Sequence, residues 1–225
     1  MPLLIKICGL KTIEALDAAL DAGADMVGFV FFPPSPRDLG IEAARALGDR
    51  VNGRARKVAL LVDATDAELD RAVEALRPDM LQLHGKEAPE RVASVRSRFR
   101  LPVMKAMPVE TRADLSQVLI YAKVVDWLLF DGRAPRDATR PGGLGKTFDW
   151  RLLEKLDPRV PFMLSGGLDA RNLAEAVRIT RASAVDVSSG VERRPGEKDP
   201  DKIRAFISAA RDAERMLAAK AVSSA

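Results

Sequence analysis

The most constraining feature of this sequence is a regular alternation of short β-rich apolar runs with longer amphipathic segments. Such alternation is typical of repeated βα units that build a parallel sheet. Eight candidate strands follow one another along the chain: Leu4–Cys8, Met26–Phe31, Lys57–Val62, Met80–Leu83, Val103–Ala106, Trp127–Phe130, Phe162–Leu164 and Ala184–Val187. An open, doubly wound sheet in a chain of this size would more often have about five or six strands. The count therefore favours a closed (β/α)8 barrel over the alternative, an open α/β sheet.

Each candidate strand is followed by a segment with helical periodicity, so that one βα unit takes about 20 to 30 residues. These segments are Thr12–Ala22, Ile41–Asn52, Asp66–Leu76, Pro89–Phe99, Thr111–Ala122, Asp149–Lys155, Ala170–Arg178 and Asp199–Leu217. No linker sequence or change of composition divides the chain. We therefore expect a single α/β domain, a barrel of residues 1–217, followed by a flexible C-terminal tail of residues 218–225.

Composition narrows the classes of partner. Of the 225 residues, 47% are hydrophobic and 30% are charged, a balance typical of a soluble globular protein. The formal charge of +4 and the pI of about 9.4 raise the question of an anionic macromolecule as partner. However, basic residues alternate with acidic ones and aromatic residues make up only 5% of the chain, which argues against nucleic-acid binding. Solvated helix faces of mixed charge explain the basic residues better.

The lone cysteine, Cys8, excludes an intramolecular disulfide and argues against a zinc cluster. The N-terminal residues lack the charged start and the long apolar centre of a signal peptide. The longest strongly apolar stretch, Met26–Phe32, is far shorter than the roughly 18 residues that cross a bilayer. We therefore expect a cytoplasmic protein with no metal site and no membrane partner.

Small residues follow the seventh and eighth candidate strands, at the end of the barrel where active sites of this fold lie. The two turns are Ser165-Gly166-Gly167 and Ser188-Ser189-Gly190. Small residues let backbone N–H groups approach an anion closely. As a pair, the turns predict a phosphate site, although either one alone could be an ordinary strand-to-helix turn.

A glycine-rich segment, Gly142-Gly143-Leu144-Gly145-Lys146-Thr147, follows the sixth strand. It does not match a Walker loop, because Arg140 stands where that motif needs glycine. It does not match a dinucleotide fingerprint either, because Phe148 stands in place of the third glycine. We interpret the loop between Asp131 and Phe148 as a mobile lid that adds backbone donors to the phosphate site.

Period-two alternation in the first strand places Lys6 and Cys8 on the inner face of the barrel, with Cys8 nearer the open end. The eighth strand is adjacent in a closed barrel, so Asp186 is expected to pair with Lys6. A lone cysteine is most often a small buried hydrophobic residue. Beside a lysine, a thiolate could also serve as a base, because such surroundings lower its pKa toward neutrality.

Polar side chains end or follow three other strands. Asp131, partly desolvated opposite Cys8, could donate a proton to a leaving oxygen, although aspartate is common in turns. His84 ends the fourth strand on the same face as Gln82, where a structural histidine is at least as plausible as a catalytic one. Arg37 follows a proline-rich turn and is either a surface residue or a guanidinium that grips a substrate carboxylate through two hydrogen bonds.

In combination, these motifs resemble those of one enzyme family, the phosphoribosylanthranilate isomerases. The similarity extends from the first strand to the final helix. The motifs that carry it are Lys6–Gly9, Gly28–Arg37, Gln82–Gly85, Leu129–Asp131, Gly142–Trp150, Leu164–Gly167, Val185–Glu192 and Pro195–Asp199.

The resemblance implies an intramolecular oxidoreductase of the aldose–ketose isomerase class that works in tryptophan biosynthesis without a cofactor or metal. The implied reaction is the Amadori rearrangement of N-(5-phosphoribosyl)anthranilate to 1-(2-carboxyphenylamino)-1-deoxyribulose 5-phosphate. By the family pattern, Asp131 is the general acid, Cys8 is the general base, and Arg37 holds the anthranilate carboxylate. The full set of expected substrate-binding residues is Arg37, Gln82, His84, Gly142, Gly143, Gly145, Ser165, Gly166, Gly167, Ser188, Ser189 and Gly190.

Two other functions stay open. A histidine-pathway phosphoribosyl isomerase, or a bifunctional enzyme of both pathways, resembles this chain at the phosphate loops but uses an aspartate where this chain has Cys8. Its substrate also carries two phosphates, and the first half of the chain has no second pair of glycine-rich loops. A non-catalytic barrel could instead bind a phosphorylated ligand, but it would not need Cys8, Asp131 and Arg37 together. In each case the expected partner is a small phosphorylated molecule, and the chain could be a monomer or a homodimer.

Overall fold

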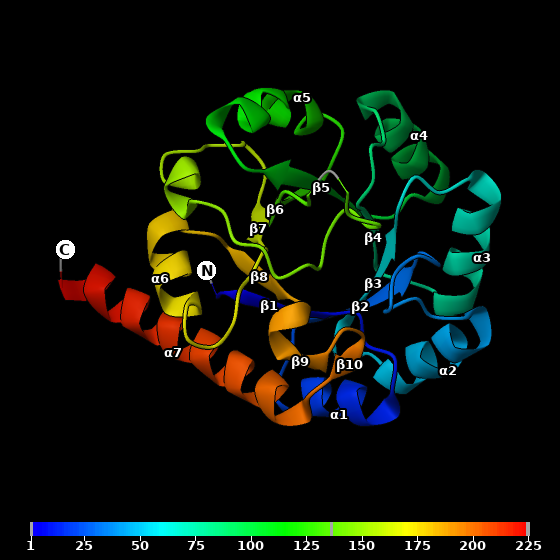
Figure 1. Ribbon diagram of the computed structural model, residues 1–225, viewed down its shortest axis with the longest axis horizontal. Coiled ribbons are helices and arrows are strands. Elements are labelled where there is room, and N and C mark those ends of the chain that lie inside the picture. Colours follow the sequence, from blue (N-terminus) through cyan, green and yellow to red (C-terminus); the bar gives the residue numbers. More distant parts are fainter. Residues whose placement is uncertain (1, 136, 224–225) are drawn as a thin grey trace.

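Eight parallel strands form a closed barrel in the computed structural model, which describes residues 2–135 and 137–223 (Figure 1). Each strand pairs with the next along the chain, and the eighth pairs back onto the first. The strands are β1 (Leu4–Cys8), β2 (Met26–Phe31), β3 (Arg56–Leu61), β4 (Met80–Leu83), β5 (Val103–Val109), β6 (Trp127–Gly132), β7 (Phe162–Leu164) and β8 (Ala184–Val187). The predicted fold class is confirmed. The largest differences from the predicted strands are at the ends of β5 and β6, which continue to the rim of the barrel.

Helices surround the barrel on its outer face (Figure 1). They are α1 (Ile13–Asp21), α2 (Ile41–Val51), α3 (Asp66–Leu76), α4 (Pro89–Phe99), η1 (Arg112–Gln117), α5 (Val118–Tyr121), η2 (Trp150–Leu153), α6 (Leu173–Thr180), η3 (Ser189–Val191) and α7 (Pro200–Ser223), where η marks a 3-10 helix. The segment expected to be helical over 149–155 forms only the short η2. The helix expected from Ala170 begins at Leu173, because the Asp169 carboxylate accepts hydrogen bonds from two backbone N–H groups that follow it and holds them in a turn.

A short hairpin between β8 and α7 was not predicted. Its strands are β9 (Glu192–Arg194) and β10 (Glu197–Lys198), joined through Gly196. The Pro-Gly pair at 195–196 is a turn signal that was not used. Gly196 has a φ of +84°, and a Cβ on it would lie 2.4 Å from the carbonyl oxygen of Pro36. The hairpin therefore packs directly against the loop after β2.

A cluster of apolar side chains fills a large part of the barrel interior. Its buried members are Met26, Val58, Met80, Met104, Ala106, Leu129, Met163 and Ala184. In β1 the alternation is as predicted: Ile5 and Ile7 pack in the layer between barrel and helices, while Lys6 and Cys8 belong to the inner face. The large apolar contact area on both sides of the sheet is the main stabilising term for such a barrel.

The last helix holds the first strand in place. In α7, Arg211 donates to the carbonyl oxygen of Leu3 at 2.8 Å and to the Asp25 carboxylate at 2.8 Å. Glu214 accepts from the N–H of Leu3 at 2.9 Å. The expected tail is helical in its first part, since α7 continues to Ser223, and residues 224–225 lie outside the described part of the chain. Within the described residues, no helix combines the length and the apolar character needed to cross a membrane.

Candidate active site

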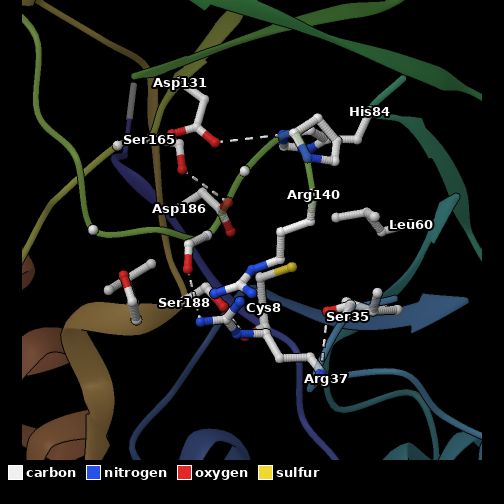
Figure 2. Close-up of a pocket in the computed structure, with 18 of the residues that line it drawn as sticks. Cys8, Ser35, Arg37, Leu60, His84, Asp131, Arg140, Ser165, Asp186 and Ser188 are labelled. Carbon is white, nitrogen blue, oxygen red and sulfur yellow. Dashed lines mark hydrogen bonds and ion pairs between the residues drawn. The ribbon is translucent and has the colours of Figure 1, made fainter. Parts of the chain in front are cut away.

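A pocket opens at the carboxyl ends of the strands, and its lining comes from strand ends and loops between Cys8 and Ser189 (Figure 2). It brings together all of the predicted site residues except Gln82 and Gly190. Those that line it are Cys8, Arg37, His84, Asp131, Gly142, Gly143, Gly145, Ser165, Gly166, Gly167, Ser188 and Ser189. Asp186, Arg140 and the apolar side chains of Val30, Phe32, Leu60 and Val62 complete most of the wall. The closed barrel thus assembles one site from residues spread over the whole sequence.

Cys8 lies in this pocket with only 3% of its surface exposed. Burial raises the pKa of its thiol above the usual value, against the opposing attraction of Lys6 and Lys198. The expectation of a pKa lowered toward neutrality is therefore wrong for the free protein, because loss of hydration outweighs the nearby cations. A Cβ at Gly28 on the adjacent strand would lie 2.8 Å from the sulfur, so only glycine leaves room for Cys8 there.

Beneath Cys8, Lys6 pairs with Asp186 as the alternation predicted. The Lys6 Nζ to Asp186 Oδ1 distance is 2.8 Å, and the lysine side chain is fully buried. Burial alone would lower the pKa of Lys6, but Asp186 and Cys8 together raise it. Ser165 donates a hydrogen bond to the second oxygen of Asp186 at 3.2 Å, which joins the pair to the turn after β7. The pair therefore fixes β1 against β8 at the base of the site.

Asp131, His84 and Gln82 form a chain of polar contacts on the other side of the pocket. Asp131 Oδ2 is 3.4 Å from His84 Nε2 (Figure 2). His84 Nδ1 is 3.0 Å from the amide nitrogen of Gln82, which is buried inside the barrel and does not reach the pocket. An amide nitrogen can only donate, so Nδ1 accepts and the proton of a neutral ring lies on Nε2, facing Asp131. Gln82 thus orients the histidine, and the histidine contacts the carboxylate.

Arg37 is buried, which excludes the surface alternative. Its guanidinium forms two hydrogen bonds of 2.8 Å with Glu192, through Nε and Nη2, and Nη2 also donates to the carbonyl oxygen of Gly143. The prediction that this guanidinium offers a two-bond grip to a ligand carboxylate needs correction, because a protein carboxylate already occupies its Nε–Nη2 edge. Nη1 makes no hydrogen bond to any of the described residues and remains for a ligand.

Glu192 and Lys198 are site residues that the sequence reasoning missed. Glu192 Oε1 accepts from both Arg37 and Lys198, each at 2.8 Å. Lys198 also donates to the carbonyl and hydroxyl oxygens of Ser188, and that hydroxyl donates to the carbonyl oxygen of Cys8. Burial lowers the pKa of Lys198 to about 8, although Glu192 opposes the shift. The motifs Val185–Glu192 and Pro195–Asp199 contain these residues, but a charged run after a strand is more often a solvated segment and did not predict that the two side chains pair.

The predicted phosphate turns converge with the glycine-rich loop at one end of the pocket. Gly166 and Gly167 have φ angles of +87° and +64°, in the region that favours glycine. A Cβ at Gly167 would lie 2.9 Å from the carbonyl oxygen of Gly145. None of the described residues accepts a hydrogen bond from the N–H of Gly145, Gly166 or Gly167. Gly190 lies behind the pocket, where a Cβ would lie 2.0 Å from the carbonyl oxygen of Leu168.

The loop after β6 lies across the mouth of the barrel. Added Cβ atoms would lie 2.5 Å from His84 Nε2 at Gly142 and 2.4 Å from Arg37 Nη1 at Gly143. The glycines therefore let the loop backbone touch both sides of the site. The mobility expected of this loop stays a prediction.

Arg140 is a further pocket residue, and no motif in the sequence predicted a role for it. Its side chain comes from the loop after β6 and is directed into the pocket in Figure 2. Its Nε is buried and has no hydrogen-bond partner among the described residues.

Comparison with known proteins places these features in one family. A family model described as N-(5'phosphoribosyl)anthranilate (PRA) isomerase matches residues 5–209. An N-(5'-phosphoribosyl)anthranilate isomerase from Bradyrhizobium sp. (strain ORS 278) is 66% identical over 216 residues, covering 96% of this chain and 99% of the relative.

Solved structures agree in fold over nearly the whole chain. The phosphoribosyl anthranilate isomerase from Thermotoga maritima superposes with a TM-score of 0.83 at 34% identity, covering 93% of this chain and 99% of the other. A phosphoribosyl anthranilate isomerase in complex with reduced 1-(o-carboxyphenylamino)-1-deoxyribulose 5-phosphate gives a TM-score of 0.81 at 32% identity, with the same coverage.

Proposed function

Because this chain belongs to the N-(5'-phosphoribosyl)anthranilate isomerase family, an enzyme family of tryptophan biosynthesis, we propose that its barrel mouth carries out the Amadori rearrangement of N-(5-phosphoribosyl)anthranilate. The single observation that supports the residue roles is that Cys8 and Asp131 line one pocket together with the glycine turns of the proposed phosphate site. The proposed proton transfers need no cofactor and no metal.

The substrate phosphate binds at the turns after β7 and β8. The N–H groups of Gly145, Gly166 and Gly167 support this assignment, because none of the described residues accepts a hydrogen bond from them and an anion satisfies several such donors at once. The aromatic ring then extends toward the apolar wall formed by Phe32 and Val62. Binding at both ends fixes the sugar between Asp131 and Cys8.

Asp131 acts first, as the general acid. Its carboxyl group gives a proton to the ring oxygen of the ribose, the bond from C1′ to that oxygen breaks, and the nitrogen lone pair forms a C1′=N iminium. His84, whose ring proton faces Asp131 at 3.4 Å, holds the carboxyl group in position. The orientation of His84 depends in turn on the Gln82 amide.

Cys8 acts second, as the general base. Its thiolate removes the proton from C2′, and the electrons of that C–H bond move to form a C1′=C2′ enolamine while the iminium is neutralised. The enol then loses its hydroxyl proton as C1′ gains one, which leaves a ketone at C2′ and a secondary amine at C1′. No atoms are gained or lost, so the overall change is an isomerisation.

The test is direct turnover. Freshly generated N-(5-phosphoribosyl)anthranilate is mixed with the purified protein, and the loss of anthranilate-type fluorescence is followed. We expect Cys8→Ser and Asp131→Asn each to lower kcat by about 10²- to 10⁴-fold, the usual effect of losing a general acid or base. Asp149→Asn is the matched control, because Asp149 is an exposed aspartate that caps η2 outside the pocket.

The outcomes separate the alternatives. No turnover by the wild-type protein would support a non-catalytic barrel and contradict the proposal as a whole. Full turnover by Cys8→Ser would remove only the role given to Cys8. Activity on the histidine-pathway substrate as well would indicate a bifunctional enzyme.

The same proposal bears on the class of substrate and on the oligomeric state. We expect the substrate to be a small cytoplasmic metabolite that carries one phosphate and one carboxylate. Light scattering on the purified protein distinguishes the monomer from the homodimer, both of which are compatible with the site described.

A further inference from the structure

Two guanidinium groups face the same pocket, and only one of them has a carboxylate. Arg37 is held by Glu192 through two hydrogen bonds of 2.8 Å. Arg140 makes no ion pair with any of the described residues, and its Nε is buried without a partner. Burial lowers the pKa of the Arg140 guanidinium, and repulsion from Arg37 adds to this effect. The two guanidinium groups repel each other, and the Nε of Arg140 has no partner among the described residues, so an anion bound beside both would stabilise them.

The position of Arg140 distinguishes between the two anionic ends of the substrate. The phosphate turns around Gly166 and Ser189 lie at the end of the pocket nearest β7 and β8. Arg140 also lines a second, adjoining cavity at the mouth, which shares Phe32, Val62 and Pro141 with the first. Apolar side chains on both sides of this junction suit an aromatic ring better than a phosphate. The anion expected beside Arg140 is therefore the one attached to the ring.

We propose that Arg140, together with Nη1 of Arg37, binds the carboxylate on the aromatic ring of the substrate. This inference rests on the proposed function and adds a binding residue from the loop after β6. Arg37 supplies a fixed charge, because Glu192 and the carbonyl of Gly143 hold it in place. Arg140 supplies its Nε donor, for which the described residues provide no acceptor.

In this proposal, the loop after β6 discriminates between substrates with and without the ring carboxylate. A substrate with the ring carboxylate ties the loop to the barrel through Arg140, whereas one without it leaves Arg140 unpaired beside Arg37. Rejection of a ligand that leaves buried polar groups unpaired is stronger than rejection by shape alone. The enzyme is thus expected to discriminate between the carboxylated ring and a plain phenyl ring.

The test compares two ligands by calorimetric titration. One is reduced 1-(2-carboxyphenylamino)-1-deoxyribulose 5-phosphate, and the other is the same compound without its carboxyl group. The wild-type protein should prefer the carboxylated ligand. Arg140→Met should lower the affinity for the carboxylated ligand by about 10- to 100-fold, the effect of losing a charge-assisted hydrogen bond. The affinity for the other ligand should stay within about twofold. The affinity of Arg140→Lys for the carboxylated ligand should lie between those of the wild type and Arg140→Met, because lysine keeps the charge but not the planar pair of donors.

Arg151→Met is the charge-matched control, since Arg151 is exposed on η2 outside both cavities at the mouth. It should change neither affinity. Equal weakening of both ligands by Arg140→Met would assign the arginine to the phosphate or to loop folding and overturn the proposal. An unchanged affinity for both ligands would overturn it as well. Either result is separate from a failure of the proposed function, because turnover by the wild-type protein is measured independently.

Discussion

Cys8 lies between two buried groups of charged side chains, and both connect the start of the chain to its end. One is the Lys6–Asp186 pair beneath it, and the other joins Arg37, Glu192 and Lys198 beside it. Breaking a buried pair by removing one partner typically costs about 3–5 kcal/mol, so these residues support the structure as well as the site. Their common effect on Cys8 is electrostatic, since Lys6 and Lys198 favour the thiolate that burial disfavours.

The pH dependence of turnover should report this balance. A base must be deprotonated, and burial raises the pKa of the Cys8 thiol, so kcat/KM is expected to rise with pH from neutral into the alkaline range. Lys198→Met removes a charge that lowers this pKa, so its kcat/KM should be lower below pH 8, by up to about tenfold for 1.4 kcal/mol. The pKa of Lys198 is about 8, so the two profiles should converge above that pH, where the lysine is neutral in the wild type as well.

The profiles are measured from initial rates in buffers of constant ionic strength. Glu192 keeps its hydrogen bonds to Arg37 in the variant, and thermal denaturation measures the stability that is lost with the Lys198–Glu192 pair. Identical profiles at every pH would show that Lys198 has no influence on the base.

Sequence patterns predicted only part of this site, and the reason why a residue was missed differs from one residue to the next. Lys6 and Asp186 could be paired in advance because strand alternation and barrel closure fix both positions. Glu192 was not assigned, because the Pro195-Gly196 pair signals a turn but does not show that the turn places Glu192 against Arg37. The raised pKa of Cys8 was missed for a similar reason, since its degree of burial depends on loops from the other half of the chain.

Loops rather than strands give the mouth of the barrel its shape. The loop after β6 packs on the turn after β7 through glycine backbones, with Gly167 directly below Gly145 and Thr147. This close packing brings the free N–H groups of three glycines to one place. It also explains the short η2, because the residues before it are used to cover the mouth instead of extending a helix.

A matched pair of glycine substitutions tests this packing. Gly167→Ala and Gly23→Ala both place a side chain at positive φ, +64° and +87°, and both should cost about 1–2 kcal/mol in unfolding free energy. A Cβ at Gly167 would also lie 2.4 Å from Thr147 Cγ2, whereas nothing lies within 4 Å at Gly23. Only Gly167→Ala should therefore raise KM, by about tenfold or more if one hydrogen bond to the phosphate is lost.

Steady-state kinetics and urea unfolding of both variants supply the readout. An equal KM in Gly167→Ala and wild type would show that the loop tolerates a displacement of the turn. A raised KM in Gly23→Ala would mean that backbone strain alone accounts for the effect.

Helices were predicted less accurately than strands at this scale, and their start signals explain why. The predicted helix Asp66–Leu76 agrees with α3, whose first turn is fixed by a capping box of Thr65 and Glu68. At Ala170 the periodic pattern begins before the helix does, because Asp169 and Asn172 bind each other's backbone first. The apolar periodicity of the sequence does not show this competition between side chains and backbone, so it predicts the start of the helix too early.

The molecule as a whole is held closed by its two ends. β1 pairs with β8, and α7 reaches across to Leu3 and Asp25 through Arg211 and Glu214. The fold class followed from counting strands because parallel strands in this number close on themselves. The contribution of α7 was not visible in that count, since its contacts with the first strand involve backbone atoms.

Truncation tests where the domain ends. A chain that ends at Leu217 keeps Arg211 and Glu214, so its unfolding free energy should stay within about 0.5 kcal/mol of the full chain. A chain that ends at Ala210 loses both side chains and leaves the Leu3 N–H and the Asp25 carboxylate without these partners. It should be destabilised by about 2–4 kcal/mol.

Thermal and urea denaturation of the three chains, with turnover assays, measure this difference. Marked destabilisation of the chain that ends at Leu217 would contradict a domain boundary at that residue.

The pairing of Lys6 with Asp186 has a consequence for the synthesis of the protein on the ribosome. β1 is among the first segments to emerge and β8 among the last, because synthesis proceeds from the N-terminus. Until β8 and the residues after it emerge, Lys6 lacks the Asp186 carboxylate, and Cys8 lacks the hydrogen bond from Ser188 and the nearby charge of Lys198. We therefore expect the complete pocket to form only when translation is nearly finished, and a chain that terminates before β8 to show no turnover.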